Sequence, residues 1–251
     1  MDLFDYMRAN TMEKESPLAS RMRPTTLDEV VGQKHIIGKD KLLYRAIKAD
    51  KLGSVIFYGP PGTGKTTLAK VIANTTSARF EQINATVAGK KDMEQVVQEA
   101  KDRMGMYGKR TILFVDEIHR FNKGQQDYLL PFVEDGTLIL IGATTENPSF
   151  EVIRPLLSRC QLYVLKSLEK EDLLELLQRA ITTDAVLKER KIELKETTAM
   201  LRFSGGDARK LLNILELVVQ SETEETVVIT DEMVTERLQQ NPLAYDKDGA
   251  D

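Results

Sequence analysis

The chain has 251 residues, of which 41% are hydrophobic and 29% are charged, and its formal net charge at pH 7 is −4. This composition can build a buried core, excludes a disordered chain, and argues against nucleic-acid binding by bulk charge alone. One cysteine and two histidines exclude a disulfide framework and a four-ligand zinc site, and no apolar run approaches the ~20 residues that span a bilayer.

Residues 1–20 mix acidic and apolar residues and lack the basic-then-apolar order of a secretory signal. We therefore expect a soluble, cytoplasmic protein whose first twenty residues are a flexible segment. The stretch LFDYM within this segment is a candidate for docking a partner, but a frayed terminus is the simpler interpretation.

Residues 21–165 alternate short apolar runs with helical patterns. The runs have strand length and β-forming residues, and they cover 54–58, 79–83, 111–115, 138–142 and 160–164. Apolar residues recur at three- and four-residue steps in the segments between them, at 66–76, 92–104 and 125–133. This alternation predicts an α/β fold with a five-stranded parallel sheet covered by helices.

A phosphate-binding loop follows the first predicted strand and opens a helix, as the G-x-x-x-x-G-K-[ST] motif requires. Its backbone N–H groups and the helix N-terminus form an anion cradle, in which Lys65 bridges the β- and γ-phosphates of a nucleotide and Thr66 is a Mg²⁺ ligand. The alternative is a turn with a chance Gly-Lys-Thr, which both flanking elements disfavour. The candidate nucleotide-binding residues are Gly59, Pro60, Pro61, Gly62, Thr63, Gly64, Lys65, Thr66 and Thr67.

Two acidic residues end the third predicted strand, at the sheet edge where open α/β sheets bind ligands. Asp116 fits a Mg²⁺ ligand, and Glu117 fits the base that polarises an attacking water. The alternative interpretation is an acid that caps the following helix. Because a phosphate loop shares this edge, we favour the catalytic interpretation.

The next strand ends in Gly-Ala-Thr-Thr-Glu-Asn, and a polar residue there can hold the attacking water. Thr145 is the first candidate and Asn147 the second, with a simple strand-ending turn as the alternative.

Arg159 precedes the fifth strand and is a candidate for the arginine that a neighbouring subunit supplies to the γ-phosphate. A solvated surface arginine is the alternative.

From residue 166 the pattern is helical only, so we expect a lid domain over 166–240 made of helices alone, followed by a polar tail at 241–251. Arg209 lies in the first turn of a predicted helix, where a cation is unfavourable for the helix dipole. A nucleotide phosphate is therefore a candidate partner, and a salt bridge to Asp207 is the alternative.

These motifs, in this order, resemble an AAA+ ATPase of the clamp-loader and Holliday-junction-motor branch. The Arg-Pro segment with Val30 and Val31 is similar to the one that surrounds the adenine in that branch, and Ser-Arg-Cys at 158–160 is similar to its arginine-finger signature. The stretches PLASRMRP, GPPGTGKTTLA, FVDEIHRFNKGQQDYLLPFVEDG and GATTENPSFEV more closely resemble the replication-associated recombination protein A family, bacterial relatives of the Werner-helicase-interacting ATPase.

The resemblance implies ATP and Mg²⁺ as cofactors and ATP hydrolysis at stalled replication forks. It also implies stimulation by single-stranded, gapped or forked DNA, single-stranded-DNA-binding protein and replisome components as partners, a nucleoid-associated location and a homotetramer. Members of the family continue past a DKDG-like segment into an oligomerisation region, so we expect this chain to be a fragment without it.

Several other functions remain compatible with these motifs. A clamp-loader subunit or a branch-migration motor uses the same motifs, a nucleotide-switched scaffold needs only binding, and a small-metabolite kinase shares the phosphate loop alone. Lys90 and Lys91 follow the second strand and are candidates for DNA contact, although solvated lysines are the commoner case. Cys160 fits a packed small residue better than a redox switch.

Overall fold

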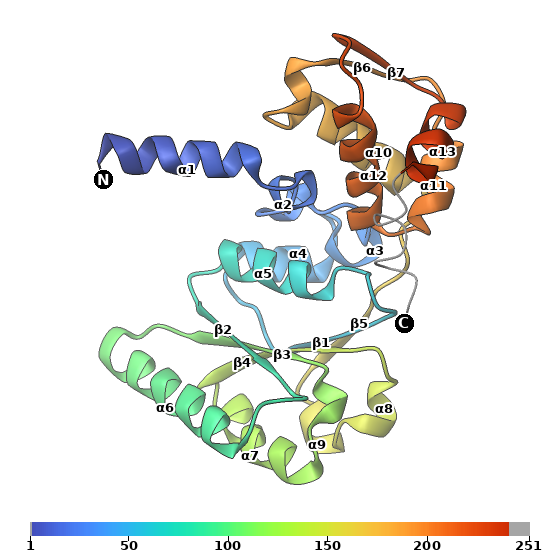
Figure 1. Cartoon of the computed structure of the whole chain (residues 1–251). Coiled ribbons are helices and arrows are strands. Elements are labelled where there is room, and N and C mark those ends of the chain that lie inside the picture. Colours follow the sequence, from blue (N-terminus) through green and yellow to red (C-terminus); the bar gives the residue numbers. More distant parts are fainter. Residues whose placement is uncertain (1, 241–251) are drawn as a thin grey trace. The chain divides into compact units, whose positions relative to one another are not determined.

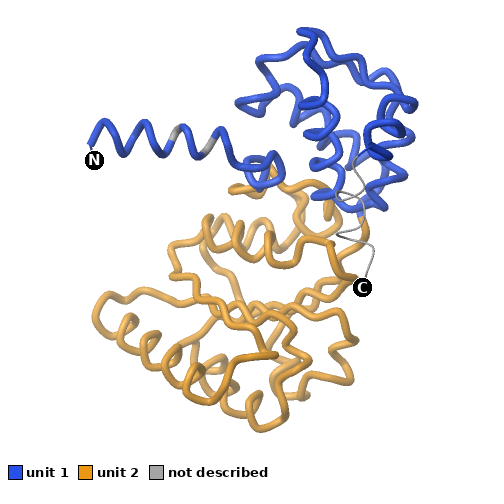
Figure 2. The backbone as a smooth tube through the Cα atoms, viewed as in Figure 1, with its two compact units in different colours: residues 1–23, 168–251 blue, residues 24–167 orange. Residues whose placement is uncertain are grey.

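The computed structural model describes residues 2–240 and divides the chain into two compact units (Figures 1 and 2). Unit 2 is the continuous segment Pro24–Ser167, and unit 1 combines the residues up to Arg23 with those from Leu168 onward. The chain therefore passes between the units twice. Among residues 2–240, no helix is both long and apolar enough to cross a membrane.

Unit 2 is built on a five-stranded sheet in the order β2-β3-β4-β1-β5. Each pair of neighbouring strands is parallel. The strands are β1 (Val55–Tyr58), β2 (Arg79–Asn84), β3 (Thr111–Asp116), β4 (Leu138–Thr144) and β5 (Gln161–Val164). The predicted α/β fold with five parallel strands is confirmed.

Helices cover both faces of this sheet (Figure 1). One face packs against α4 (Leu42–Lys48) and α5 (Lys65–Thr75), and the other against α6 (Lys90–Tyr107), α7 (Lys123–Glu134) and α9 (Arg154–Leu157). Along β4 the side chains alternate, with Ile139 and Ile141 in the first core and Leu138 and Leu140 in the second. Because both faces are buried, this strand is apolar at successive positions.

Unit 2 also contains four short elements, two before its first strand and two between later strands. They are η1 (Leu27–Glu29), α3 (Lys34–Ile37), η2 (Ile118–Arg120) and α8 (Pro148–Glu151). α7 begins with a capping box, in which the Asn122 side chain accepts from the Gln125 amide and the Gln125 side chain accepts from the Asn122 amide, at 2.8 and 2.9 Å. This cap fixes where the chain leaves the turn after β3.

Unit 1 contains four longer helices in its C-terminal part: α10 (Lys170–Thr183), α11 (Thr198–Ser204), α12 (Ala208–Gln220) and α13 (Asp231–Gln239). It also contains η3 (Leu187–Glu189) and a parallel pair of strands, β6 (Lys191–Leu194) and β7 (Thr226–Ile229). The expectation of helices alone is corrected here. Each strand has only four residues, with buried Val227 and Ile229 alternating along β7, and this period-two pattern is too short to stand out in the sequence.

The N-terminal residues are helical where a flexible segment is expected. They form α1 (Leu3–Glu15) and α2 (Leu18–Arg21), and α2 belongs to the packed part of unit 1 because Leu18 is fully buried. Residues 21–23, expected in the nucleotide-binding domain, also belong to unit 1. The predicted tail at 241–251 lies outside the described residues.

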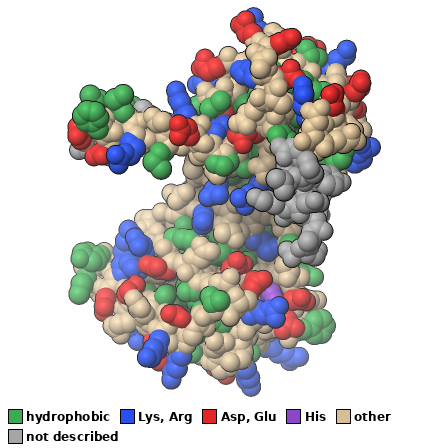
Figure 3. Space-filling model, in the orientation of Figure 1, with side chains coloured by type: hydrophobic (Ala, Val, Ile, Leu, Met, Phe, Trp, Pro, Cys, Tyr) green, Lys and Arg blue, Asp and Glu red, His purple; other side chains and the backbone are tan. Residues whose placement is uncertain are grey.

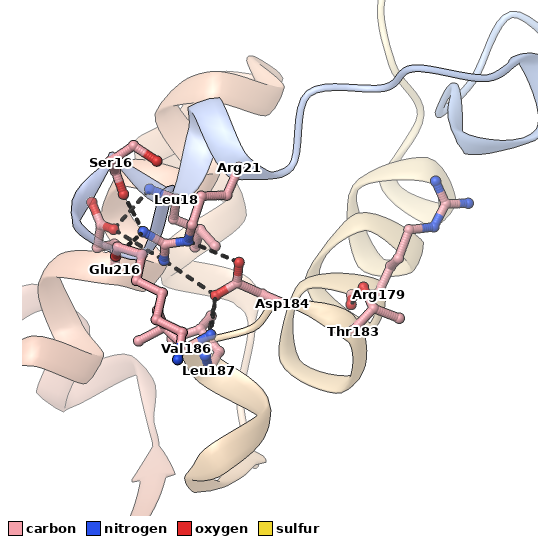
Figure 4. A network of polar contacts seen from close by, with 10 residues as sticks. Ser16, Leu18, Arg21, Arg179, Thr183, Asp184, Val186, Leu187 and Glu216 are labelled. Atoms are coloured by element: carbon pink, nitrogen blue, oxygen red, sulfur yellow. Dashed lines mark hydrogen bonds and ion pairs between the residues drawn. The ribbon is translucent and has the colours of Figure 1, made fainter. Parts of the chain in front are cut away.

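A network of polar contacts holds α2 within unit 1 (Figure 4). The Arg21 guanidinium donates to both carboxylate oxygens of Asp184, at 2.9 and 3.1 Å, and to the carbonyl of Ser16. The Leu18 amide donates to Glu216 at 2.8 Å. The side chains of Arg21 and Asp184 are almost fully buried, so the two form a buried salt bridge that joins α2 to the end of α10.

The surface carries charges of both signs. On the face shown in Figure 3, Lys and Arg side chains are interspersed with Asp and Glu side chains in each unit. This arrangement agrees with the small net charge of the whole chain.

Candidate nucleotide-binding site

The phosphate loop connects β1 to α5 through backbone conformations that favour glycine. Gly62 and Gly64 have φ values of 78° and 87°, and Gly64 is the N-cap residue of α5. Gly59 is needed for a different reason, because a Cβ there would lie 2.8 Å from the carbonyl oxygen of Leu165. The loop is thus folded tightly against the end of β5, with the N-terminus of α5 directed at its centre.

The ammonium group of Lys65 lies inside this loop. Its Nζ donates to the carbonyl oxygens of Gly59 and Pro60 at 2.7 and 2.8 Å, with the Thr63 hydroxyl at 3.4 Å. Burial lowers the pKa of Lys65 below its usual value, and the negative charge of Asp116 partly opposes that shift. Lys65 and Asp116 are therefore electrostatic neighbours, although they are 51 positions apart in the sequence.

Asp116 and Glu117 form a sharp turn at the end of β3. The Glu117 amide donates to Asp116 Oδ1 at 3.0 Å, and Glu117 has a φ of 53°, which is uncommon for a residue other than glycine. Both side chains are half-buried. Such a backbone conformation redirects the second carboxylate relative to the first, and positions of this kind are concentrated at functional sites.

The end of β4 completes the same edge of the sheet. The strand ends at Thr144, which is 1% exposed and whose carbonyl accepts from the Gly59 amide at 3.2 Å. Thr145, the first candidate for holding water, is the next residue and is exposed. Asn147, the second candidate, caps α8 by accepting from the Ser149 amide at 3.0 Å, which engages its side chain locally.

Val30 and Val31 are half-buried and precede a buried glutamine that ties their segment to the site. The Gln33 side chain donates to the carbonyl of Lys166 at 2.7 Å, reaches the carbonyl of Thr63 at 3.5 Å, and accepts from the Lys166 amide at 3.0 Å. The resemblance includes Gln33 in the segment that surrounds the adenine, but the sequence predicted no contact for its side chain. The structure makes it the bridge between residues 30–33, the phosphate loop and the chain after β5.

Arg159 lies at the opposite edge of the sheet from the phosphate loop. β5 runs parallel to β1 with Gln161 opposite Val55, so Arg159 precedes the amino end of β5, whereas the phosphate loop follows the carboxyl end of β1. Arg159 is exposed and pairs with Glu134 at 3.5 Å. Within one chain, Arg159 is therefore remote from Lys65.

Two further residues that the sequence singled out are Arg209 and Cys160. Arg209 belongs to unit 1 and is exposed in the first turn of α12. The Asp207 carboxylate, its alternative partner, caps this helix by accepting from the Lys210 amide at 3.0 Å. Burial raises the pKa of Cys160 to about 12, so the thiol stays protonated at neutral pH and is a weak nucleophile.

Over residues 2–240, no three or more His, Cys, Asp and Glu side chains gather into a set that would enclose a metal ion. A Mg²⁺ ion bound with a nucleotide needs no such set, because it takes one or two protein ligands together with phosphate oxygens and water. A hydroxyl at the start of α5 (Thr66) and a carboxylate at the end of β3 (Asp116) fit that chemistry.

Two family models match the chain. The model of the ATPase family associated with various cellular activities (AAA) matches residues 55–168, and that of the AAA C-terminal domain matches residues 187–251.

Similar proteins and structures bear related names. The replication-associated recombination protein A of Coxiella burnetii is 48% identical over 238 residues, which cover 93% of this chain and 53% of that protein. The ATPase WRNIP1 of Dictyostelium discoideum is 38% identical over 97% of this chain and 30% of its own length. The RuvB Holliday junction branch migration motor of Thermotoga maritima aligns with a TM-score of 0.68 at 27% identity, covering 92% of this chain and 76% of that one. The chain spans about half the length of the first of these relatives.

Proposed function

This chain is an AAA ATPase of the replication-associated recombination protein A family, and on that basis we propose that it binds ATP with Mg²⁺ and hydrolyses it to remodel or protect DNA at stalled replication forks. One observation carries the proposal. The ammonium group of Lys65 lies inside the phosphate loop, where it donates to the Gly59 and Pro60 carbonyls, and the negative charge of Asp116 acts on it from the end of β3.

The proposal gives the nucleotide a defined set of contacts. The amides of residues 59–67 and the Lys65 ammonium hold the phosphates, and Thr66 and Asp116 share the Mg²⁺ ion. Val30 and Val31 line the adenine. Lys65 now donates to two carbonyl oxygens of its own loop, and a bound phosphate would replace those contacts with stronger charge-assisted ones.

Hydrolysis uses groups next to the ends of three strands and one group of the helical lid. Glu117 polarises the attacking water and Thr145 orients it from the neighbouring strand. Arg159 reaches the γ-phosphate held by a neighbouring copy of the chain, and Arg209 contributes a second positive charge from the helical lid. The position of Arg159 at the far edge of its own sheet supports action in trans, which requires a homo-oligomer.

The names of the relatives support a role in replication-associated recombination. The rest of the DNA-related part of the proposal follows the resemblance to the family alone. It comprises stimulation by DNA ends or gaps, association with single-stranded-DNA-binding protein and the replisome, and a tetrameric assembly in the nucleoid. A branch-migration motor is the nearest competing function, because the structural likeness extends to the RuvB motor over 92% of this chain. A clamp-loader subunit and a nucleotide-switched scaffold would use the same nucleotide site.

The test separates binding from hydrolysis with two variants. Lys65→Ala should abolish binding of ATP–Mg²⁺, measured by calorimetry, because the charge that meets the phosphates is lost. Glu117→Gln should keep the affinity within about threefold yet lower the turnover number by about 100-fold or more, the range of a general base. Unchanged ATP binding by Lys65→Ala would refute the proposed site.

The DNA arm compares ATP turnover without DNA and with blunt duplex, gapped duplex and forked duplex at one fixed salt concentration, since phosphate contacts depend strongly on salt. Several-fold stimulation by gapped or forked DNA is expected. Equal rates with every substrate would favour the scaffold, and movement of a four-way junction would favour the branch-migration motor.

A further inference from the structure

His119 contacts Thr144, the last residue of β4, and the proposed function assigns no role to either residue. Its Nδ1 lies 2.9 Å from Thr144 Oγ1. His119 is half-buried on η2, the turn that starts directly after Glu117. Thr144 is 1% exposed and directly precedes Thr145. This contact therefore joins the turn that carries the proposed base to the turn that carries the proposed water-holding residue.

Thr144 connects these turns to the phosphate loop as well. Its hydroxyl donates to the Glu146 carbonyl at 3.1 Å and accepts from the Glu146 amide at 2.9 Å, which closes the turn around Thr145. Its own carbonyl accepts from the Gly59 amide at 3.2 Å. One buried threonine thus contacts the start of the phosphate loop, the turn at residues 144–146 and the turn after β3.

The hydrogen count links the direction of the histidine contact to the tautomer of His119. A threonine hydroxyl has one proton, and when that proton goes to the Glu146 carbonyl, the Nδ1 of His119 has to carry a proton and donate it. When the hydroxyl proton goes to Nδ1 instead, His119 accepts it. An amide nitrogen at the same place would donate equally well, whereas a methyl group would leave Thr144 without this partner.

Packing keeps the two turns close to each other. Ile118, which precedes the histidine, is fully buried and packs over Gly142 of β4, where a Cβ would lie 3.1 Å from its side chain. The absence of a side chain at Gly142 lets η2 approach the strand. The hydrogen bond from His119 then sets the relative position of the two turns.

We propose that His119 is a positioning residue for ATP hydrolysis, which holds Thr144 so that Thr145 and Glu117 address the same water molecule. The inference rests on the proposed ATPase function. It assigns His119 no contact with the nucleotide, so its loss should lower the rate of the chemical step and leave nucleotide affinity unchanged.

The kinetic test compares three substitutions in the whole chain. His119→Ala should lower kcat by about tenfold or more, the size expected when reacting groups are misplaced, with KM and the ATP dissociation constant within about twofold. His119→Asn, whose amide can replace Nδ1–H, should recover most of the lost turnover. Thr144→Val should resemble His119→Ala, and the double variant should be no slower than either single one.

A second measurement does not depend on turnover. In His119→Ala, hydrogen exchange at the Glu146 amide should become several-fold faster, and it should return toward the wild-type rate in His119→Asn. The Ala85 amide, which donates to the Asp116 carbonyl at 3.0 Å, is the internal control and should not change. Thermal unfolding of the variants checks that each remains folded.

The outcomes are distinguishable. Wild-type turnover and wild-type Glu146 exchange in His119→Ala would overturn the inference, as would a folded His119→Asn that recovers neither quantity. If the wild-type chain does not hydrolyse ATP, or Lys65→Ala still binds it, the proposed function fails first. The exchange measurement then decides alone whether His119 holds the turn.

Discussion

At the scale of single residues, Gly59 shows how tightly the phosphate loop is built. Its amide donates to the Thr144 carbonyl, its carbonyl accepts from Lys65, and its Cα faces the carbonyl of Leu165. One position thereby ties the loop to the ends of β4 and β5. A Cβ at this position would meet the backbone carbonyl of Leu165 first, and a backbone atom cannot move away as the end of a flexible side chain can.

Gly59→Ala should destabilise the chain by about 1–3 kcal/mol, the usual range for overpacking, and should weaken ATP–Mg²⁺ binding. The free energy of unfolding from urea titration and the dissociation constant from calorimetry measure the two effects. Gly53→Ala is the matched control, because a Cβ there meets nothing within 4 Å. Equal behaviour of the two variants would show that the loop adjusts to the added methyl group.

At this scale, sequence reasoning succeeds where the chemistry is local. The phosphate loop has a fixed spacing, so its nine residues are recognisable without knowledge of the sheet. The contact between His119 and Thr144 was not predicted, because it depends on how β3 and β4 align. A histidine that follows two acidic residues in the sequence does not by itself indicate which residue it will contact.

At the scale of elements, α2 has a role in unit 1 that its four residues do not suggest. Burial alone would raise the pKa of Asp184. The hydrogen bonds from Arg21 and from the Leu187 and Val186 amides outweigh that effect and hold the pKa below its usual value of 3.8. The ionised carboxylate therefore stabilises the folded state at neutral pH, and that contribution is lost as the pH falls below about 3.8, through the lower pKa of the folded state.

Asp184→Asn should lower the free energy of unfolding at pH 7 by about 3 kcal/mol, because it leaves Arg21 without its main charged partner. Between pH 5 and the acid limit of folding, the variant should lose less stability than the wild type. Denaturant titrations at several pH values provide the measurement. Asp40→Asn is the control, because it removes an exposed pair with Lys41 and should change the free energy of unfolding by less than about 0.5 kcal/mol. The prediction would be contradicted if the free energy of unfolding of wild type and of Asp184→Asn changed with pH in parallel.

Elements with a strong period were predictable, and short ones were not. Strands such as β3 are apolar at nearly every position because both faces are covered, which separates them clearly from amphipathic helices. The pair β6 and β7 was missed because four alternating residues also fit a turn. α2 was missed because its partners lie more than 160 residues away, and no local pattern records such a contact.

At the scale of the whole molecule, the position of Arg159 makes a single copy an incomplete enzyme under the proposed mechanism. The ATP turnover number should rise with protein concentration as copies associate, since each site needs an arginine from a neighbour. Arg159→Ala should lower the assembled rate by about 10³-fold or more, the lower end of the range for such arginines, with little effect on assembly.

The matched control is Arg154→Ala, which removes the other exposed arginine of the same segment and should leave the assembled rate within about twofold. A mixture of Arg159→Ala with Glu117→Gln should regain activity, because each variant supplies the group that the other lacks. An unchanged rate for assembled Arg159→Ala would remove the requirement for a neighbour.

Leu18 and Arg21 have a final consequence for how the protein is made. Both are translated before Asp184 and Glu216, the residues they bind, which follow more than 160 positions later, and all of Pro24–Ser167 is translated in between. The five-stranded sheet of unit 2 can therefore fold during translation before α10 and α12, which contact α2, have been made. Unit 1 therefore completes its packing only after α12 has been made, and until then α2 lacks the residues that bind Leu18 and Arg21.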